Sequence, residues 1–317
     1  MTTSDGAPAR VVAVVVAYAR RDRLVAALGA LAGPSRAVAA GLGGARAAAG
    51  GAAVVAATHG VAPTVLELAR NTGGAGGFAV GLAHAVEEMA ADLVWLMDDD
   101  TIPTPGALQE LLAARDGYGG PVALLGSRVV WTDGRDHPMN TPRRRPGAAG
   151  AEVRSAASVA AVPVRSSSFV SMLVDARAVR HHGLPVADYF IWNDDFEYSA
   201  RLLRSGTGLH VPRSVVEHRT KTFGATDADP GPRFYYEVRN KIWMLTRSSS
   251  LSPSERVLYA GASARRWLRT AARSQDRRTL LAAGVKGLRG GVFRRPRPIR
   301  RVRAGLGRVR ASVARGG

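Results

Sequence analysis

Continuous apolar runs along the chain predict strands that are buried on both faces of a sheet. Val11 to Ala17 reads VVAVVVA, and its β-branched residues favour an extended backbone packed on both sides. A second run, DLVWLM at 92–97, has the same character. Weaker patterns predict further strands at 52–56, 64–68, 122–130 and 168–174.

Apolar residues at helical spacing follow several of these runs. In the segment 23–31, Leu24, Leu28 and Leu31 lie on one side of a helix. Similar patterns predict helices at 79–90, 105–114, 176–182, 196–204, 234–247 and 254–272. The alternation of strands and helices through the first half predicts an α/β fold with a Rossmann-like, mostly parallel central sheet flanked by helices.

The polar positions change in character near residue 255. From Glu255 onward the sequence holds 18 Lys and Arg against 2 Asp and Glu, whereas the preceding 254 residues hold 26 against 23. The C-terminal part therefore carries most of the net charge of +19, which indicates an anionic partner surface. We expect an α/β domain over 1–250, a basic helical extension over 251–290 and an Arg-rich, disordered tail over 291–317.

The absence of cysteine limits the available chemistry. Without thiolates, a metal ion can be held only by oxygen or imidazole ligands, and no disulfide can form. This favours a cytoplasmic protein, and the apolar run at 11–17 lacks the basic start and cleavage site of a secretory signal. The Ala/Gly-rich stretch at 37–57 is poor in large apolar residues and contains Arg46, so we do not expect it to span a membrane.

Three aspartates stand directly after the strand predicted at 92–97. Ligands of open α/β sheets bind beyond the carboxyl ends of the strands, so Asp98, Asp99 and Asp100 would lie at the binding edge. Side chains two apart in an extended segment point the same way, which lets Asp98 and Asp100 share one cation. Carboxylate oxygens suit Mg²⁺ or Mn²⁺ that bridges to substrate phosphates. An acidic turn that caps the next helix would give the same tripeptide, so both interpretations stay open here.

A glycine-rich segment, NTGGAGGF at 71–78, precedes the helix predicted at 79–90. Glycines let the backbone approach a ligand closely, and a helix N-terminus offers free N–H groups to an anion. The segment has neither the Gly-Lys-Ser/Thr of a Walker A loop nor the register of a dinucleotide fingerprint. A plain glycine-rich turn is the alternative interpretation.

A second acidic cluster, WNDDFEY at 192–198, stands at the start of the helix predicted at 196–204. Trp192 can stack on a sugar ring, and a carboxylate beside an acceptor hydroxyl can act as general base. Helix capping accounts for one or two acids in a first turn but does not require the tryptophan. His218 follows a strand-like segment and could complete an oxygen-dominated metal site, although a lone histidine is more often structural.

Taken in this order, the segments resemble the GT-A fold glycosyltransferases of family 2, in particular the actinobacterial galactofuranosyl- and rhamnosyltransferases of cell-wall galactan assembly. That group carries an N-terminal strand, an N-x-G-G-A-G-G-F loop, a W-L-x-D-D-D motif, a W-x-D-D-x-E motif and a later histidine. The corresponding segments here are Val11–Tyr18, Asn71–Phe78, Trp95–Asp100, Trp192–Glu197 and His218. The resemblance spans residues 10–247 and includes Tyr235-Tyr236 and Arg239-Asn240.

The resemblance assigns residues to the donor side of a site. Asp98, Asp100 and His218 would hold Mg²⁺ or Mn²⁺, and Asp98 and Asp99 would also face the nucleotide-diphosphate sugar donor. The nucleotide and its sugar would lie along a further set of residues, namely Tyr18, Arg20, Asn71, Gly74, Gly77 and Trp192.

The resemblance also assigns the acceptor side. Asp195 would take the proton of the acceptor hydroxyl, and Asp194 and Glu197 would orient the acceptor or the base. In-line attack would invert the anomeric centre without a covalent enzyme intermediate. The implied reaction is transfer of galactofuranose from UDP-galactofuranose to a hydroxyl of a polyprenyl-linked cell-wall glycan. A rhamnosyltransferase that uses dTDP-rhamnose is the nearest alternative.

The cationic extension fits a lipid-linked acceptor. Trp267, Leu268, Leu280 and Leu281 are interleaved with arginines, as in helices that lie on anionic lipid. We therefore expect peripheral binding to the inner face of the plasma membrane, with an Arg-rich surface of no specific role as the alternative. Nucleic acid is not expected as a partner, because it would leave both acidic clusters unexplained. A nucleotidyltransferase, a further alternative, tends to need an N-terminal glycine-rich loop, and residues 18–23 contain no glycine.

Overall fold

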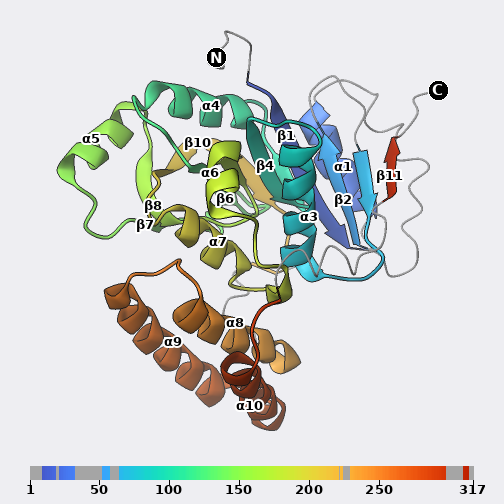
Figure 1. The fold of residues 1–317 in the computed structure, drawn as a ribbon, viewed down its shortest axis with the longest axis vertical. Helices are drawn as coiled ribbons and strands as arrows, with labels where there is room; N and C mark the ends of the chain where they lie inside the picture. The colour runs from blue at the N-terminus through green and yellow to red at the C-terminus, as the bar shows by residue number, and fades with distance from the viewer. Residues whose placement is uncertain are drawn as a thin grey trace.

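The computed structural model describes an α/β domain and a layer of C-terminal helices (Figure 1). The described residues are 9–18, 21–32, 52–57, 64–220, 222–223, 229–297 and 310–313. The strands are β1 (Val11–Tyr18), β2 (Ala52–Ala57), β3 (Thr64–Glu67), β4 (Leu93–Asp98), β5 (Thr101–Pro103), β6 (Leu124–Val130), β7 (Arg143–Arg144), β8 (Val162–Ser166), β9 (Met172–Asp175), β10 (Gly208–His218) and β11 (Arg310–Val313). The helices are α1 (Arg21–Ala32), α3 (Gly73–Glu87), α4 (Ala107–Gly117), α5 (Gly150–Ser158), α6 (Ala176–His182), α7 (Asp194–Leu202), α8 (Phe234–Arg247), α9 (Pro253–Arg273) and α10 (Arg277–Phe293), with short 3₁₀ turns η2 (Ala187–Tyr189) and η4 (Gly231–Arg233).

The strands form one mixed sheet in the order β11-β3-β2-β1-β4-β9-β6-β10-β8-β7, with β5 paired to β10. β1 and β4 run parallel, as do β6 and β10, and β9 lies antiparallel between β4 and β6. β2 and β3 are antiparallel to their neighbours. The predicted α/β class is confirmed, in a sheet whose two parallel pairs are joined by an antiparallel strand. Apart from β2, the Ala/Gly-rich positions at 36–60 lie outside the described residues.

The alternation of side chains along β1 divides the core of the sheet domain into two layers. Val12, Val14 and Val16 belong to an apolar cluster that includes residues of α3, α6 and α7. Ala13 and Val15 belong to a second cluster, which includes residues of α1 and α4. Both faces of the central strands are thereby buried, as their continuous apolar runs predict.

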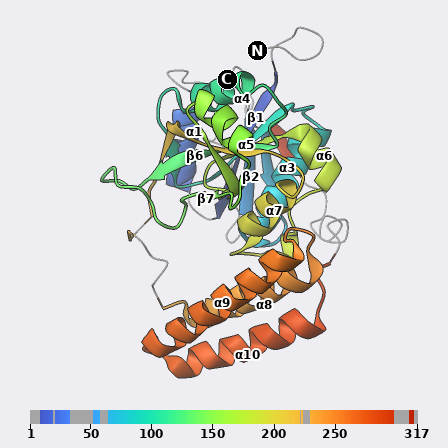
Figure 2. The same ribbon diagram turned by 90° about the vertical axis from the view of Figure 1, so that its left-hand side faces the viewer.

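Helices α8, α9 and α10 form a separate layer beneath the sheet domain (Figures 1 and 2). Two glycines of α10 allow it to pack closely on α8. A Cβ at Gly287 would lie only 2.7 Å from the Tyr235 carbonyl oxygen, and a Cβ at Gly291 only 2.7 Å from Ile242 Cβ. The boundary expected at residue 250 falls inside this layer, and α10 continues past residue 290 to its end at Phe293. Among the described residues, no helix is long and apolar enough to cross a membrane.

Arg165 ties this helical layer to the sheet domain. It is buried at β8 and donates two hydrogen bonds to the Glu255 carboxylate, at 2.6 and 3.1 Å. A third bond, at 2.6 Å, reaches the Ala200 carbonyl of α7. Glu255 also completes the capping box of α9 with Ser252. The start of α9 is therefore fixed to the same helix that carries the second acidic cluster.

Candidate active site

The three aspartates lie where β4 turns into β5. Asp98 is the last residue of β4, and Asp99 and Asp100 form the turn before β5. β5 pairs with the end of β10, so that Thr101 lies opposite His218. This register brings one ligand atom each from Asp98, Asp100 and His218 to within 4.8 Å of one another. The three residues predicted to bind metal therefore lie close together. A turn and the pairing of β5 with β10 bring them there, whereas the sequence suggested that Asp98 and Asp100 would point the same way along one extended segment.

His218 is oriented by a residue far away in the sequence. Its Nδ1 lies 2.9 Å from Asn140 Oδ1, and the Asn140 amide nitrogen donates to Ser168 Oγ at 3.1 Å. Because that second bond fixes which amide atom faces the imidazole, Nδ1 of His218 is assigned the proton and donates it. Nε2 then directs a lone pair toward Asp100 Oδ1, 3.1 Å away. Two acceptors at this separation require a positive charge between them, either a proton or a metal ion.

The same cluster fits a hard divalent cation. Adjacent ligands of an octahedral ion with bonds of about 2.1 Å lie about 3 Å apart, close to the 3.1 Å between His218 and Asp100. Burial and the neighbouring Asp100 raise the pKa of Asp98 to about 7, and His218 opposes the shift. Arg23 offsets part of the negative charge through an ion pair of 2.7 Å with the second Asp100 oxygen. A bound cation would stabilise the crowded carboxylates in their charged form.

The second acidic cluster follows a turn with an uncommon backbone. Phe190, Trp192 and Asn193 have positive φ angles of 66°, 66° and 63°. This conformation costs a residue other than glycine about 1 kcal/mol or more. Such a turn persists only where the surrounding structure holds it, and it often marks a functional site.

Helix α8 holds this turn through Arg239 and Asn240. The Asn240 amide donates to the carbonyls of Tyr189, Ile191 and Trp192, each at 2.9 Å. Arg239 donates to the Tyr189 carbonyl at 3.1 Å and to Asn240 Oδ1 at 2.9 Å. The Arg-Asn pair, which the sequence indicates only through the family resemblance, therefore fixes the turn that leads into α7.

Asp194 and Asp195 open α7 and lie in the electrostatic field of the first cluster. The charge of Asp195 contributes to the raised pKa of Asp98, and the charge of Asp98 contributes to the raised pKa of Asp194. Burial is the main cause of the raised pKa of both Asp194 and Asp195. Asp195 stays partly exposed, and its Oδ1 accepts the Phe196 N–H at 2.7 Å. The two acidic clusters therefore lie close enough for their charges to interact, and the pKa of the Asp195 carboxyl on the α7 side is raised.

Both carboxylate oxygens of Glu197 accept hydrogen bonds within the fold. The residue is 2% exposed and forms a bidentate pair with Arg201, at 2.9 and 3.2 Å. Its Oε1 also accepts the Ser248 hydroxyl at 2.6 Å. Because both oxygens are engaged, Glu197 supports the first turn of α7 from within and does not offer a carboxylate to an acceptor.

The glycine-rich segment forms the first turns of α3 and is not a loop. A Cβ at Gly73 would lie 2.0 Å from the Phe190 carbonyl oxygen, and one at Gly77 would lie 2.5 Å from Val16 of β1. Gly77 therefore serves the close packing of α3 on the sheet, while Gly74 is half-buried with room for a side chain. Packing against the turn and the sheet explains the glycines at these contacts without a ligand.

The other donor-side predictions lie on neighbouring elements. Asn71 precedes α3, and its Oδ1 accepts a backbone N–H two residues on, at 2.8 Å. Tyr18 ends β1 with 47% of its surface exposed, Asp99 is buried, and Trp192 is half-buried. Arg20 lies outside the described residues.

Comparison with known families decides what kind of protein carries this site. The profile of the family described as "Glycosyltransferase like family 2" matches residues 8–251, a range that includes both acidic clusters and His218. The chain belongs to this family. It is therefore a glycosyltransferase with the GT-A fold, as its motifs predict.

Relatives of this glycosyltransferase include galactofuranosyltransferase GlfT1 of two mycobacteria. The chain is 33% identical over 226 residues to GlfT1 of Mycobacterium tuberculosis (strain ATCC 25618 / H37Rv), which covers 66% of this chain and 69% of the relative. It is 33% identical over 153 residues to GlfT1 of Mycolicibacterium smegmatis, covering 46% of this chain and 49% of the relative. Among solved structures, S. aureus TarS 1–349 in complex with UDP-GlcNAc matches with a TM-score of 0.45 and 11% identity, over 70% of this chain and 62% of that chain.

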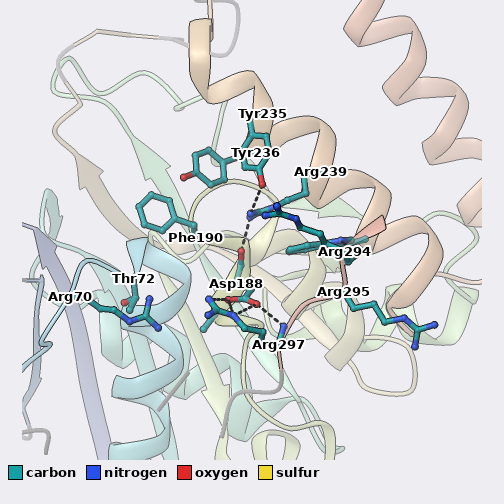
Figure 3. Close-up of a pocket in the computed structure, with 12 residues that line it drawn as sticks. Arg70, Thr72, Asp188, Phe190, Tyr235, Tyr236, Arg239, Arg294, Arg295 and Arg297 are labelled. Carbon is teal, nitrogen blue, oxygen red and sulfur yellow. Dashed lines mark hydrogen bonds and ion pairs between the residues drawn. The ribbon is translucent and has the colours of Figure 1, made fainter. Parts of the chain in front are cut away.

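The glycosyltransferase also has a cavity of about 620 Å³ that its sequence motifs do not indicate (Figure 3). It lies among the start of α3, the η2 turn, α8 and the segment that follows α10. Its charged lining consists of five arginines and one aspartate: Arg70, Arg239, Arg294, Arg295, Arg297 and Asp188. Because these residues come from four separate segments, no local motif could reveal the cavity.

Proposed function

We propose that the protein is an inverting galactofuranosyltransferase, which transfers galactofuranose from UDP-galactofuranose to a hydroxyl of a lipid-linked glycan. The observation that supports this most is the set of cation ligands, with the second acidic cluster within electrostatic reach of it. Asp98, Asp100 and His218 form a set of cation ligands, and Asp195 lies close enough to influence the pKa of Asp98. The 33% identity to GlfT1 supports the choice of donor.

The donor would be held on the side of the first cluster. Asp98, Asp100 and Nε2 of His218 would bind Mg²⁺ or Mn²⁺, which neutralises charge on the departing diphosphate. Asn140 keeps the imidazole proton on Nδ1, so that Nε2 faces this side. Arg23 holds the second oxygen of Asp100 and so limits rotation of that carboxylate.

Asp195 would act on the acceptor as general base. It takes the hydroxyl proton while the acceptor oxygen bonds to the anomeric carbon and the bond from that carbon to the diphosphate breaks. Its raised pKa makes it a stronger base than an exposed aspartate. Hydrogen bonds from the Phe196 N–H and the Ser168 hydroxyl fix its direction. Attack and departure on opposite sides of the carbon invert the configuration.

Helices α9 and α10 would bring the enzyme to a membrane-bound acceptor. Eight of the eleven exposed large apolar side chains among the described residues lie on these two helices. On α10, the exposed Leu281, Val285, Leu288 and Val292 follow one another at helical spacing and form a stripe that ends beside Phe293, which is 81% exposed. The arginines of the same helices would meet anionic headgroups at the cytoplasmic face of the plasma membrane.

Nucleotide release tests the proposed donor. The purified protein, Mn²⁺ and a short prenyl-linked glycan would be combined in turn with UDP-galactofuranose, UDP-galactopyranose, UDP-glucose and dTDP-rhamnose. We expect UDP-galactofuranose to be consumed fastest, with the new linkage inverted at the anomeric carbon. Preferred release of dTDP would reassign the enzyme to rhamnosyl transfer, and retention of configuration would reject Asp195 as the base in this mechanism.

A further inference from the structure

The arginine-lined cavity has no part in the chemistry assigned to the acidic clusters. Five arginines and one aspartate line it, an excess of four positive charges. The aspartate, Asp188, is already paired with Arg297 at 2.7 Å. A ligand that complements the remaining charge must carry more than one negative charge, as a diphosphate does.

The five arginines fall into two groups. Arg239 and Arg297 are bonded to the η2 turn, at 2.6 Å to a carbonyl and 2.7 Å to a carboxylate (Figure 3). The side chains of Arg70, Arg294 and Arg295 form no hydrogen bond or ion pair with another residue in the described part of the chain. The first two build the wall of the cavity, and the other three present guanidinium groups that no described residue engages.

Aromatic rings form most of the rest of the wall, beside Thr72 and Ala187. Phe190 and Tyr236 are stacked with centroids 5.1 Å apart. The Arg239 guanidinium lies 5.0 Å from the ring centre of Tyr235 and 4.3 Å from that of Trp243. A small inorganic anion gains little from such rings. A phosphate that carries a sugar or an isoprene unit would pack against them.

The position of the cavity also indicates which substrate it serves. Phe190 belongs to the turn that leads into α7 and Asp195. On the other side, Arg294 directly follows Phe293, where the exposed apolar stripe of α10 ends. A ligand with its phosphates in the cavity could therefore direct a sugar toward Asp195 and a lipid chain toward α10.

We propose that this cavity binds the diphosphate of the lipid-linked acceptor, and that Arg70, Arg294 and Arg295 are its main ligands. The inference rests on the proposed function, which supplies an acceptor of this class. Its chemistry is distinct from that of the metal-bound donor, because here arginines and aromatic rings replace carboxylates and a cation.

Binding of geranyl diphosphate, measured by calorimetry with saturating UDP and Mn²⁺, tests the assignment. We expect Arg70→Gln/Arg294→Gln/Arg295→Gln to weaken binding at least about ten-fold, since each arginine contributes a charge-assisted bond. The matched control is Arg154→Gln/Arg180→Gln/Arg213→Gln, which removes three exposed arginines of the sheet domain and should bind as the wild type does. Thermal melting of both variants would verify that they are folded.

Three outcomes would overturn the proposal. Equal affinity in the two triple variants would remove the cavity as the site. Loss of binding in Asp98→Asn alone would place the diphosphate at the metal cluster. Inorganic pyrophosphate that binds as tightly as geranyl diphosphate would indicate a site for the free anion. If the wild type bound geranyl diphosphate as expected but released no UDP from UDP-galactofuranose, the proposed donor would fail while the cavity assignment stood.

Discussion

The acidic site and the basic cavity are built in opposite ways. In the acidic site, the end of β4 and the start of α7 place carboxylates near one another, and β10 adds His218. Burial raises the pKa of Asp98, Asp194 and Asp195, and neighbouring carboxylates add to the shift at Asp98 and Asp194. In the cavity, two arginines are bonded into the wall and three have no bonded partner in the described part of the chain. The first site is preorganised by the sheet, whereas the second relies on long side chains that close on a ligand. We therefore expect a single substitution in the acidic site to have a large effect on activity, and each substitution of a cavity arginine to have a smaller, cumulative effect on ligand binding.

The largest effect is expected at Asp195. Replacing Asp195 with Asn should lower turnover by about 10² to 10⁴, because the acceptor proton loses its base. Donor binding should survive, since the first cluster is unchanged. Steady-state rates and calorimetry with UDP and Mn²⁺ would check both parts. Turnover within a few-fold of wild type would show that the two clusters do not act as one catalytic site.

A smaller effect is expected at Asn140, beside the first cluster of the acidic site. Asn140→Ala removes the acceptor that orients His218, and loss of such a partner typically weakens metal binding by about 10 to 100-fold. Titration of UDP binding with Mn²⁺ would measure the change, and excess Mn²⁺ should largely restore turnover. Asn140→Asp keeps an acceptor for Nδ1 and should retain most of the affinity. Unchanged Mn²⁺ dependence in Asn140→Ala would mean that the hydrogen bond of 2.9 Å does not position His218.

The contrast between these two sites also shows what the sequence could predict. Buried strands and the aspartates that follow one of them are local patterns, so the α/β class and the candidate ligands Asp98 and Asp100 were predictable. His218 joined that set only through the family resemblance. The contacts of Asn140 and Arg23 with that set were not predictable, because they depend on the register of β5 against β10 and on the position of α1. A single sequence does not reveal such long-range pairings.

The glycine-rich segment shows a different limit. Absence of a Cβ serves ligand approach and tight packing equally well, so only the neighbours of each glycine can distinguish them. Here those neighbours are Phe190 and Val16, which lie far from the segment in sequence. The acids of the second cluster were equally ambiguous. Asp195 stays partly exposed, while Glu197 is bound to Arg201 inside the fold.

The link between the helical layer and the sheet domain can be tested through the stability of the fold. Hydrogen bonds from Arg165 lower the pKa of Glu255 from 4.5 to about 2. Because the folded pKa is depressed, this stabilisation is fully present above pH 4.5 and is lost as the pH falls toward 2. Glu255→Gln should lower the free energy of unfolding by roughly 1–3 kcal/mol at pH 7, and by less at pH 3. Urea denaturation at the two pH values would measure this.

The control for this change is the pair of Arg145 and Glu152, at 3.2 Å, whose arginine side chain is 34% exposed whereas that of Arg165 is 6% exposed. Glu152→Gln should cost less than about 1 kcal/mol, as partly exposed pairs usually do. A loss in Glu255→Gln that is no larger than the control, or equal at both pH values, would mean that Arg165 does not couple the helical layer to the sheet domain.

The smallest effect is expected on the exposed apolar stripe of α10. Leu288→Ser removes one exposed apolar side chain from α10 and should weaken binding to anionic vesicles several-fold, since it forfeits part of the free energy of burying a leucine. Val153→Ser on α5, also exposed, is the matched control and should bind normally. Flotation with phosphatidylglycerol vesicles would compare them. Equal flotation would remove this stripe from the membrane contact.

The central claim is that a cation held by the first cluster and the base Asp195 belong to one working site. Anomalous scattering from a crystal grown with UDP and Mn²⁺ tests it most directly. We predict one manganese peak in contact with Asp98, Asp100 and His218, with the UDP diphosphate on it and the Asp195 carboxylate facing the position of the transferred sugar. A peak on other residues, or an Asp195 carboxylate separated from that position by protein, would contradict the claim.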